Sequence, residues 1–153
     1  MNVTLDNANA VVAAALAEGR RLKLMPLSVA VLDAGGHLVA FNREDRSGIM
    51  RAEVAMGKAW GALGMGVNTR LLRDRLADRP SFQAALAIAS GGRFVPVPGG
   101  VLIRDADRTI IGAVGVSGDT SDKDEACAIA GIKAAGLRSD PAEPAEGWES
   151  SQL

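Results

Sequence analysis

Apolar residues at the start of the chain recur every three or four positions, which is the period of an α-helix. This repeat follows Thr4, a residue suited to an N-cap, and continues to about Leu22. A continuous apolar run over 27–33 and an alternating run over 37–43 come next, separated by the small residues 34–36. These patterns predict one amphipathic helix followed by a β-hairpin.

The middle of the chain returns to helical spacing. A long helix is predicted over 47–65, and shorter helices over 69–76 and 80–89. The segment 93–97 is predicted to be a short edge strand, because prolines within and just after it cannot donate a backbone hydrogen bond to a central ladder.

A second hairpin and a helix are predicted for the last third. Strands over 101–104 and 109–116 pair around a turn at 105–108, and a helix follows over about 122–137. The first residue of this helix and Glu125 have the spacing of a capping box. The order hairpin, helices, hairpin, helix predicts an α+β fold with an antiparallel sheet.

Length and composition indicate one domain. The 153 residues are 48% hydrophobic and 23% charged, which is ordinary for a globular chain with a single core. We expect the domain to span residues 1–138. Residues 139–153 contain four acidic residues and no basic one, so we expect a solvated, disordered tail. Trp148 in this tail either stays in solvent or docks on its own or a neighbouring subunit.

Charge and hydropathy exclude several classes of function. The formal net charge of −1 argues against an electrostatic nucleic-acid binder. No window has the roughly 18 apolar residues needed to span a bilayer, so no membrane partner is expected. The N-terminus lacks the pattern of a secretory signal, and the single cysteine suits a reducing compartment. A cytoplasmic location is therefore predicted.

The segment 110–125 is the most suggestive stretch for a ligand site. An apolar run ends in a loop of small and acidic residues, and a helix then begins, which is a common arrangement for binding a ligand. The alternative is a tight strand-to-helix turn. The glycine spacing is not a dinucleotide fingerprint, and the aspartates at 119, 122 and 124 miss the spacing of an EF-hand loop. No metal site is predicted, and these aspartates are expected to form turns and complement the helix dipole.

Two groups of charged residues are candidates for binding an anion. Lys58 lies on an alanine-lined face of the long helix, so its ammonium either reaches solvent at the edge or points into a cavity. A cavity lysine would bind a carboxylate, or act as a base if desolvation lowers its pKa. The quartet 43–46 is either a solvated loop or a place where Arg43 holds an anion at the mouth of a pocket.

His37 is the only histidine and begins one face of the second strand. It is either structural and exposed, or a ligand. With one histidine, one cysteine and no tyrosine, a multi-histidine metal centre and a Cys-His dyad are both disfavoured. Ser117 lacks a nucleophile-elbow pattern, which disfavours a serine hydrolase. Asp33 is expected to accept hydrogen bonds from the amides of the following turn.

Taken together, these residues make the chain resemble the GlcG/HbpS family, which includes the C-terminal domain of PduO-type proteins. The resemblance covers most of residues 5–137. Three blocks carry it: SVAVLDAGGHLVA over 28–40 followed by Arg43 and Asp45; Ala55-x-x-Lys58-Ala59; and Gly99-Gly100 followed by IGAVGVSG over 111–118 and Asp122-x-Asp124-Glu125.

The resemblance implies a profilin-like fold, with α/β/α layers around a five-stranded antiparallel sheet, and a homo-oligomer. Members of the family have been linked to haem binding, corrinoid metabolism and glycolate or propanediol utilisation. Many carry Arg-Met-Asp-Gly where this chain has Arg-Glu-Asp-Arg at 43–46. If haem is the cofactor, His37 is the first candidate for its axial ligand, and Cys127 and the methionines are weaker ones.

Two functions from different classes stay open at this point, ahead of a purely structural oligomer. The first is an accessory protein that binds a small anionic ligand or a tetrapyrrole such as haem. Its candidate binding residues are His37, Arg43, Asp45, Lys58, Ser117 and Gly118. The second is an enzyme that acts on a small oxo- or hydroxy-carboxylate. Its candidate catalytic residues are Lys58, Asp122 and Asp124.

Overall fold

Pairs of antiparallel strands lie between groups of helices along the chain, and the computed structural model describes residues 1–153. None of the helices combines the length and the hydropathy needed to cross a membrane. The elements are α1 (Leu5–Arg21), β1 (Ser28–Asp33), β2 (Leu38–Arg43), α2 (Ile49–Met65), α3 (Thr69–Leu76), α4 (Pro80–Ala89), β3 (Gly100–Arg104), β4 (Ile110–Ser117), α5 (Ser121–Ala134), β5 (Arg138–Asp140) and a 3-10 turn, η1 (Trp148–Ser150).

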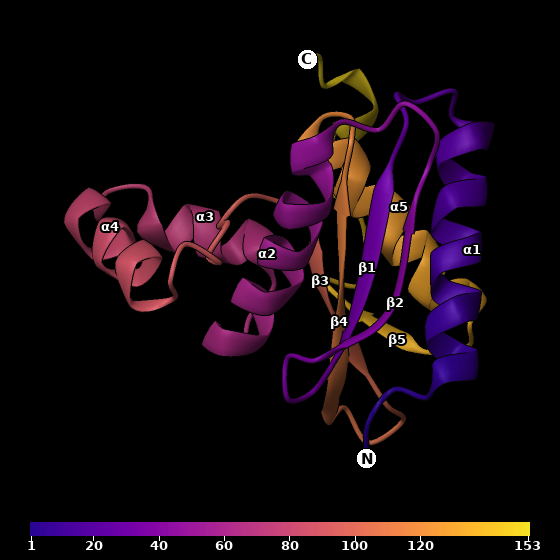
Figure 1. The fold of residues 1–153 in the computed structure, drawn as a ribbon, viewed down its shortest axis with the longest axis horizontal. Helices are drawn as coiled ribbons and strands as arrows, with labels where there is room; N and C mark the ends of the chain where they lie inside the picture. The colour runs from indigo at the N-terminus through magenta and orange to yellow at the C-terminus, as the bar shows by residue number, and fades with distance from the viewer.

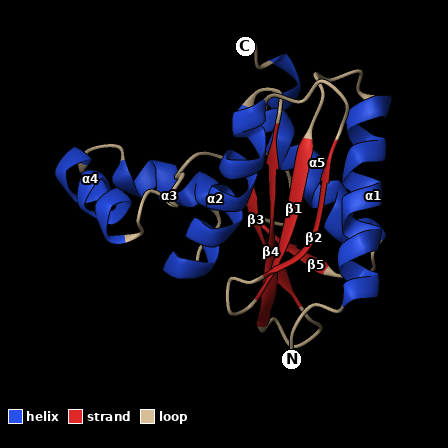
Figure 2. Cartoon of the chain, viewed as in Figure 1, coloured by secondary structure: helices blue, strands red, loops and turns tan.

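The strands form one five-stranded sheet in the order β2-β1-β4-β3-β5, and every neighbouring pair is antiparallel (Figure 2). The first hairpin and the second hairpin meet where β1 pairs with β4. In that ladder Ser28 lies opposite Ser117 at one end, and Asp33 lies opposite Gly112 at the other. The register therefore places the two ends of β1 at opposite edges of the molecule.

Helices cover both faces of the sheet (Figure 1). α1 and α5 pack on one face, and α2 packs on the other. The alternation of side chains along each strand accounts for this division. Val29 and Val31 join the larger core beneath α1 and α5, whereas Leu32 joins Ala59 and Ala62 beneath α2. The predicted α+β fold, with α/β/α layers around a five-stranded antiparallel sheet, is confirmed.

Small residues let α2 lie directly against the sheet. A side chain added at Gly115 would collide with the backbone carbonyl of Ala55, and one added at Gly100 would collide with that of Lys58. The chain has few aromatic residues and 18 glycines, so its core is built by close backbone approach. This close packing fixes the position of the α2 side chains relative to β4.

α3 and α4 form an arm that extends away from the sheet (Figure 1). Leu72, Leu76 and Phe94 make a small core of their own within it. No residue of α4 is buried, and Ile88 is 82% exposed. The predicted bounds of both helices are confirmed.

Two local predictions are wrong. The segment 93–97 is not a strand; Phe94 is instead buried in the core of the arm. The fifth strand is β5, which pairs with β3. The last helix begins one residue earlier than expected, because Thr120 is its N-cap and accepts a hydrogen bond from the Lys123 amide at 3.3 Å. Asp122 therefore does not head a capping box.

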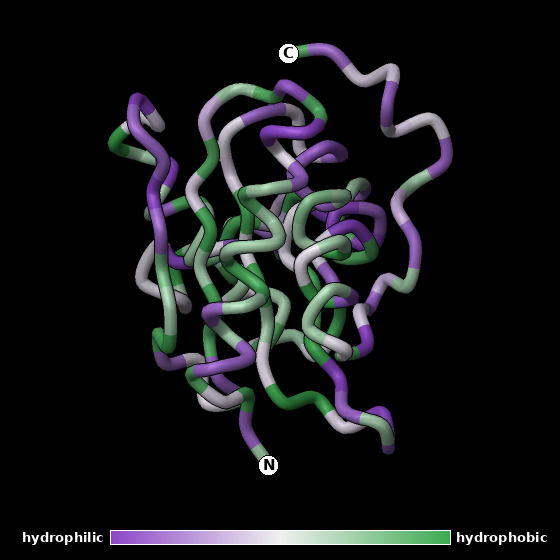
Figure 3. The backbone as a smooth tube through the Cα atoms, turned by 90° about the vertical axis from the view of Figure 1, so that its right-hand side faces the viewer, coloured by the Kyte–Doolittle hydropathy of each residue, from purple (hydrophilic) through white to green (hydrophobic).

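The C-terminal segment is ordered along the outside of the molecule, so the expected disorder is wrong for it (Figure 3). β5 crosses the expected domain boundary at residue 138 and adds this segment to the sheet. Arg104 donates two hydrogen bonds to Asp140, at 2.7 and 2.9 Å, and Lys133 donates one to Glu143 at 2.7 Å. Half-buried Trp148 belongs to η1, which lies against α5. Two of the four acidic residues, Asp140 and Glu143, thus contact basic residues of the domain.

Candidate functional site

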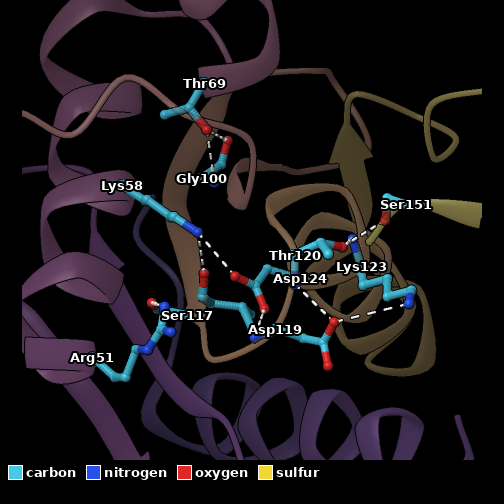
Figure 4. Close-up of polar contacts among 11 residues, drawn as sticks. Arg51, Lys58, Thr69, Gly100, Ser117, Asp119, Thr120, Lys123, Asp124 and Ser151 are labelled. Atoms are coloured by element: carbon cyan, nitrogen blue, oxygen red, sulfur yellow. Dashed lines mark hydrogen bonds and ion pairs between the residues drawn. The ribbon is translucent and has the colours of Figure 1, made fainter. Parts of the chain in front are cut away.

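Lys58 is enclosed between α2, β4 and α5 (Figure 4). Its Nζ donates to the Val116 carbonyl at 2.9 Å and lies 3.1 Å from Oδ2 of Asp124. The two side chains are 2% and 1% exposed. The ammonium therefore neither reaches solvent nor faces a cavity; it forms a buried ion pair that joins the helix layer on one side of the sheet to the helix on the other.

The loop before α5 completes the surroundings of this pair. Oδ1 of Asp124 accepts from the Asp119 amide at 3.0 Å, and the Asp119 carboxylate accepts from the Met25 amide at 2.9 Å. Burial lowers the pKa of Lys58 and raises the pKa of Asp124, and the attraction between the two charges opposes both shifts. The pair is thus a polar junction that is satisfied from within the protein.

Ser117 and Gly118 lie beside this junction. Ser117 is fully buried, and its hydroxyl accepts a hydrogen bond from Nη1 of Arg51 at 3.3 Å. A side chain at Gly118 would collide with the Pro26 carbonyl, so the glycine permits close packing of the loop on the segment that leads into β1. The structure brings Lys58, Asp124, Ser117 and Gly118 together, a meeting that the sequence alone could not show.

The charged quartet 43–46 follows β2 at the same edge. Arg43 donates to the Ser47 carbonyl at 3.1 Å, and Asp45 is exposed. The organising residue is Glu44, whose Oε1 accepts from the Leu27 amide at 2.8 Å. No sequence pattern identifies Glu44, because its partner, the Leu27 amide, is 17 positions away.

Two acidic residues of α5 face the arm. Asp122 lies 3.9 Å from Nη1 of Arg73. Glu125 is fully buried, with Oε1 3.1 Å from Nη1 of Arg70, but the guanidinium is not aligned to hydrogen-bond either carboxylate oxygen. Burial raises the pKa of Glu125 to about 7, although the positive charge of Arg70 opposes the shift. The sequence indicated only a helix start here.

His37 lies in the turn of the first hairpin, and Asp33 organises this turn. Oδ1 of Asp33 accepts from the Gly35 amide at 2.9 Å and from the His37 amide at 3.0 Å, which confirms the bonding predicted for Asp33. The same oxygen lies 3.2 Å from Nδ1 of His37. The His37 side chain is 82% exposed, so its Nε2 is open to solvent while Nδ1 is held by a carboxylate.

The predicted site residues therefore separate into two groups. Asp33, which holds His37, lies at the Gly112 end of the β1–β4 ladder, whereas Ser117 lies at the Ser28 end. Five residues of strand separate these ends, or about 16 Å. His37 cannot join Lys58 and Asp124 in one small site within a single copy of the chain.

A cavity of about 450 Å³ lies between the first hairpin, α2 and the segment after α4. Trp60 also borders two adjoining hollows, of about 180 and 140 Å³. His37 is flanked in sequence by two of the residues that line the main cavity, whereas Lys58, Ser117 and Asp124 do not line it. Its lining consists of Leu32, Gly36, Leu38, Glu53, Met56, Gly57, Trp60, Gly91, Gly92 and Arg93.

The chemistry of its walls distinguishes this cavity from another of similar volume. A cavity of about 460 Å³ next to β5 is lined mainly by charged and polar side chains. Small-molecule sites are typically apolar with a few polar groups, which fits the cavity at Trp60. The guanidinium of Arg93 lies 4.1 Å from the centre of the Trp60 ring. Neither residue stands out in the sequence, because α2 and the 91–93 segment meet only in the folded chain.

Potential metal ligands are few in this chain. No group of three or more histidine, cysteine, aspartate and glutamate side chains is arranged to hold a metal ion. Cys127 is buried in the larger core, and burial raises the pKa of its thiol to about 12. Met56 lines the cavity, whereas His37 does not line it and only neighbours the lining residues Gly36 and Leu38 in sequence.

Comparisons with known proteins indicate what the chain is similar to. A family model described as haem degrading protein HbpS-like matches residues 3–133. The solved PduOC:haem complex is 25% identical, with a TM-score of 0.81 over 92% of this chain and 99% of that one. HbpS is 28% identical, with a TM-score of 0.75 over 87% and 89%. The Klebsiella pneumoniae protein ORFY shares the fold at 24% identity, with a TM-score of 0.78 over 88% and 90%. No curated protein matches the chain.

Proposed function

This chain belongs to the HbpS-like family, and from that premise we propose that it is an accessory protein that binds a tetrapyrrole, with haem as the first candidate. The cavity at Trp60 is the proposed binding site. The observation that carries the proposal is the pairing of exposed His37 with Asp33 in the hairpin turn that supplies Gly36 and Leu38 to the cavity lining. Similarity to a protein solved as a haem complex supports the same ligand class.

The residues at the cavity fit haem. Histidines that bind a metal usually donate their other ring N–H to a carboxylate or a carbonyl, and Asp33 occupies that position for Nδ1 of His37. Nε2 is then free to bind the iron that haem would supply. Leu32, Leu38 and Trp60 offer apolar surface for a macrocycle.

The enzyme alternative has less support from the geometry. Lys58 and Asp124 are committed to one another and to backbone groups, and neither lines a cavity. The roles assigned to Lys58, Asp122 and Asp124 in catalysis, and to Arg43, Asp45, Ser117 and Gly118 in binding, stay predictions. Of the predicted binding residues, His37 is the one on which our proposal depends.

Titration of the purified protein with hemin tests the role of His37. We expect a sharp Soret band for the wild type, and an at least tenfold weaker affinity with an altered band for His37→Ala. Because His37 would act only through iron, the affinity for metal-free protoporphyrin IX should be unchanged in the variant. Asp33→Asn should weaken hemin binding by about tenfold and no more than His37→Ala does, as is typical for a group that orients a metal ligand.

The control for folding is the thermal melting of each variant without ligand. His37 is exposed, so its replacement should leave the midpoint nearly unchanged. An unaltered hemin spectrum and affinity in His37→Ala would exclude His37 as the ligand. Failure of the wild type to bind both hemin and protoporphyrin would overturn the proposed function.

We also propose that the chain forms a homo-oligomer through α4. This helix carries no charged residue from Pro80 to Ala89, and none of its residues is buried within the chain. A helix that is mainly apolar and carries no charge is normally covered by other protein surface. A second copy of the chain, as the family resemblance implies, would supply that cover.

A further inference from the structure

The cavity at Trp60 has an unequal distribution of charge. Two of its 10 lining residues are charged, Glu53 and Arg93. Glu53 precedes Trp60 by seven positions on α2, which corresponds to about 10 Å along the helix axis. Because the guanidinium of Arg93 lies over the Trp60 ring, the positive charge is at one end of this wall and the negative charge at the other.

The Arg93 side chain is held in place without being neutralised. One face of its guanidinium lies 4.1 Å from the Trp60 ring centre, and Nε donates to the Ser90 carbonyl at 3.0 Å. No carboxylate of the chain forms an ion pair with Arg93, and its two terminal nitrogens donate no hydrogen bond within the protein. The stacked ring and the single hydrogen bond therefore pre-orient a cation whose outer N–H groups are free.

We infer that Arg93 recognises a carboxylate of the ligand in this cavity and orients the ligand with that carboxylate at the Trp60 end. The inference rests on the proposed binding function and specifies its ligand class as a flat, apolar molecule that carries at least one carboxylate. Terminal N–H groups of arginine match the two oxygens of a carboxylate, and a pre-oriented guanidinium loses little entropy on binding. Glu53 repels the same group at the opposite end, so both charges favour one orientation.

Esterification of the ligand separates this inference from binding itself. Protoporphyrin IX and its dimethyl ester share the macrocycle, but only the acid carries carboxylates. We expect the wild type to bind the acid at least about tenfold more tightly, the effect of one charge-assisted hydrogen-bonded contact. Arg93→Gln should lose most of this preference while retaining the affinity for the ester. Quenching of tryptophan fluorescence by the porphyrin, measured in a Trp148→Phe background so that Trp60 alone reports, provides the measurement.

Arg79→Gln is the matched control. Arg79 also stacks on an aromatic ring, with its guanidinium 4.6 Å from the centre of the Phe82 ring, but it does not line the cavity. It should keep the full preference for the acid. Glu53→Gln, at an exposed position, provides a second test and should increase the affinity for the acid while leaving that for the ester unchanged.

The outcomes are distinguishable. If the wild type binds the porphyrins and Arg93→Gln keeps the same preference for the acid, the inference is wrong while the proposed function stands. If Arg79→Gln loses the preference as strongly as Arg93→Gln, general surface charge explains it and the inference is also wrong. If the wild type binds neither porphyrin, the proposed function fails and this inference fails with it.

Discussion

Lys58 and Asp124 show how one buried pair holds three layers of this fold together. Removing either charge from water is costly, and the cost is offset by the attraction between the two charges together with the bonds that each group makes to the backbone. The Val116 carbonyl accepts from Lys58, and the Asp119 amide donates to Asp124. The pair therefore connects α2, the end of β4 and the start of α5. Its role is to stabilise the folded state.

We predict that Lys58→Met destabilises the protein by about 3–5 kcal/mol, because it leaves the Asp124 carboxylate buried without its counter-charge. Urea unfolding measures the free energy. Lys123→Met is the control, since Lys123 is partly exposed, lies 3.9 Å from Asp119 and makes no side-chain hydrogen bond to it, so its loss should cost at most about 1 kcal/mol. Equal losses in the two variants would contradict the structural role given to Lys58.

At the scale of elements, charged side chains join α5 to α3. The buried Glu125 carboxylate lies beside Arg70, and Asp122 lies beside Arg73. Arg70 also donates to the Glu143 carbonyl of the C-terminal segment at 3.1 Å. Burial raises the pKa of Glu125 to about 7. Between pH 4.5 and 7, the Glu125 carboxyl therefore binds a proton in the folded state, whereas in the unfolded chain it has released that proton.

Stability should therefore fall as the pH rises from about 4.5, the ordinary pKa of the carboxyl, to about 7. In this window the folded state holds one more proton than the unfolded state, and the slope is at most about 1.4 kcal/mol per pH unit. Urea unfolding across the window measures it. Glu125→Gln should flatten the slope, whereas Glu146→Gln, on an exposed side chain, should not. An unchanged slope in Glu125→Gln would assign the effect to other groups.

At the scale of the whole molecule, the arm that carries α4 presents a helix in which no residue is buried within the chain. It extends from the sheet and exposes an uncharged helix (Figure 1). The segment after α4 also supplies Gly91, Gly92 and Arg93 to the wall of the cavity. A second copy that covers α4 would thus lie next to the proposed ligand site.

We predict that Ile88→Glu reduces the assembly to smaller species, because it places a charge where α4 would be buried against another copy. Light scattering coupled to size-exclusion chromatography gives the mass. Ile49→Glu changes an equally exposed residue at the start of α2, 89% against 82%, and should leave the mass unchanged. A wild type that is monomeric would contradict self-association, and dissociation by Ile49→Glu alone would place the contact at α2.

Features that depend on neighbouring residues were predictable from the sequence. The helices over 69–76 and 80–89, the first hairpin and the bonds of Asp33 to turn amides follow from local periodicity and turn chemistry. The order of these elements was enough to predict an antiparallel α+β sheet. A local pattern cannot reveal which distant segment completes a ladder, and this is why 93–97 was mistaken for the edge strand that 138–140 provides.

The sequence alone therefore determined the helices, the two hairpins, the fold class and the family resemblance, because these depend on spacing along the chain. Only the tertiary structure decided that Lys58 is paired with Asp124, 66 positions away, and that His37 lies at the other end of β1. It also brought Trp60 and Arg93 together at one cavity. The physical reason is that burial, ion pairing and cavity shape depend on distances through space, which are set when the helices pack on the sheet.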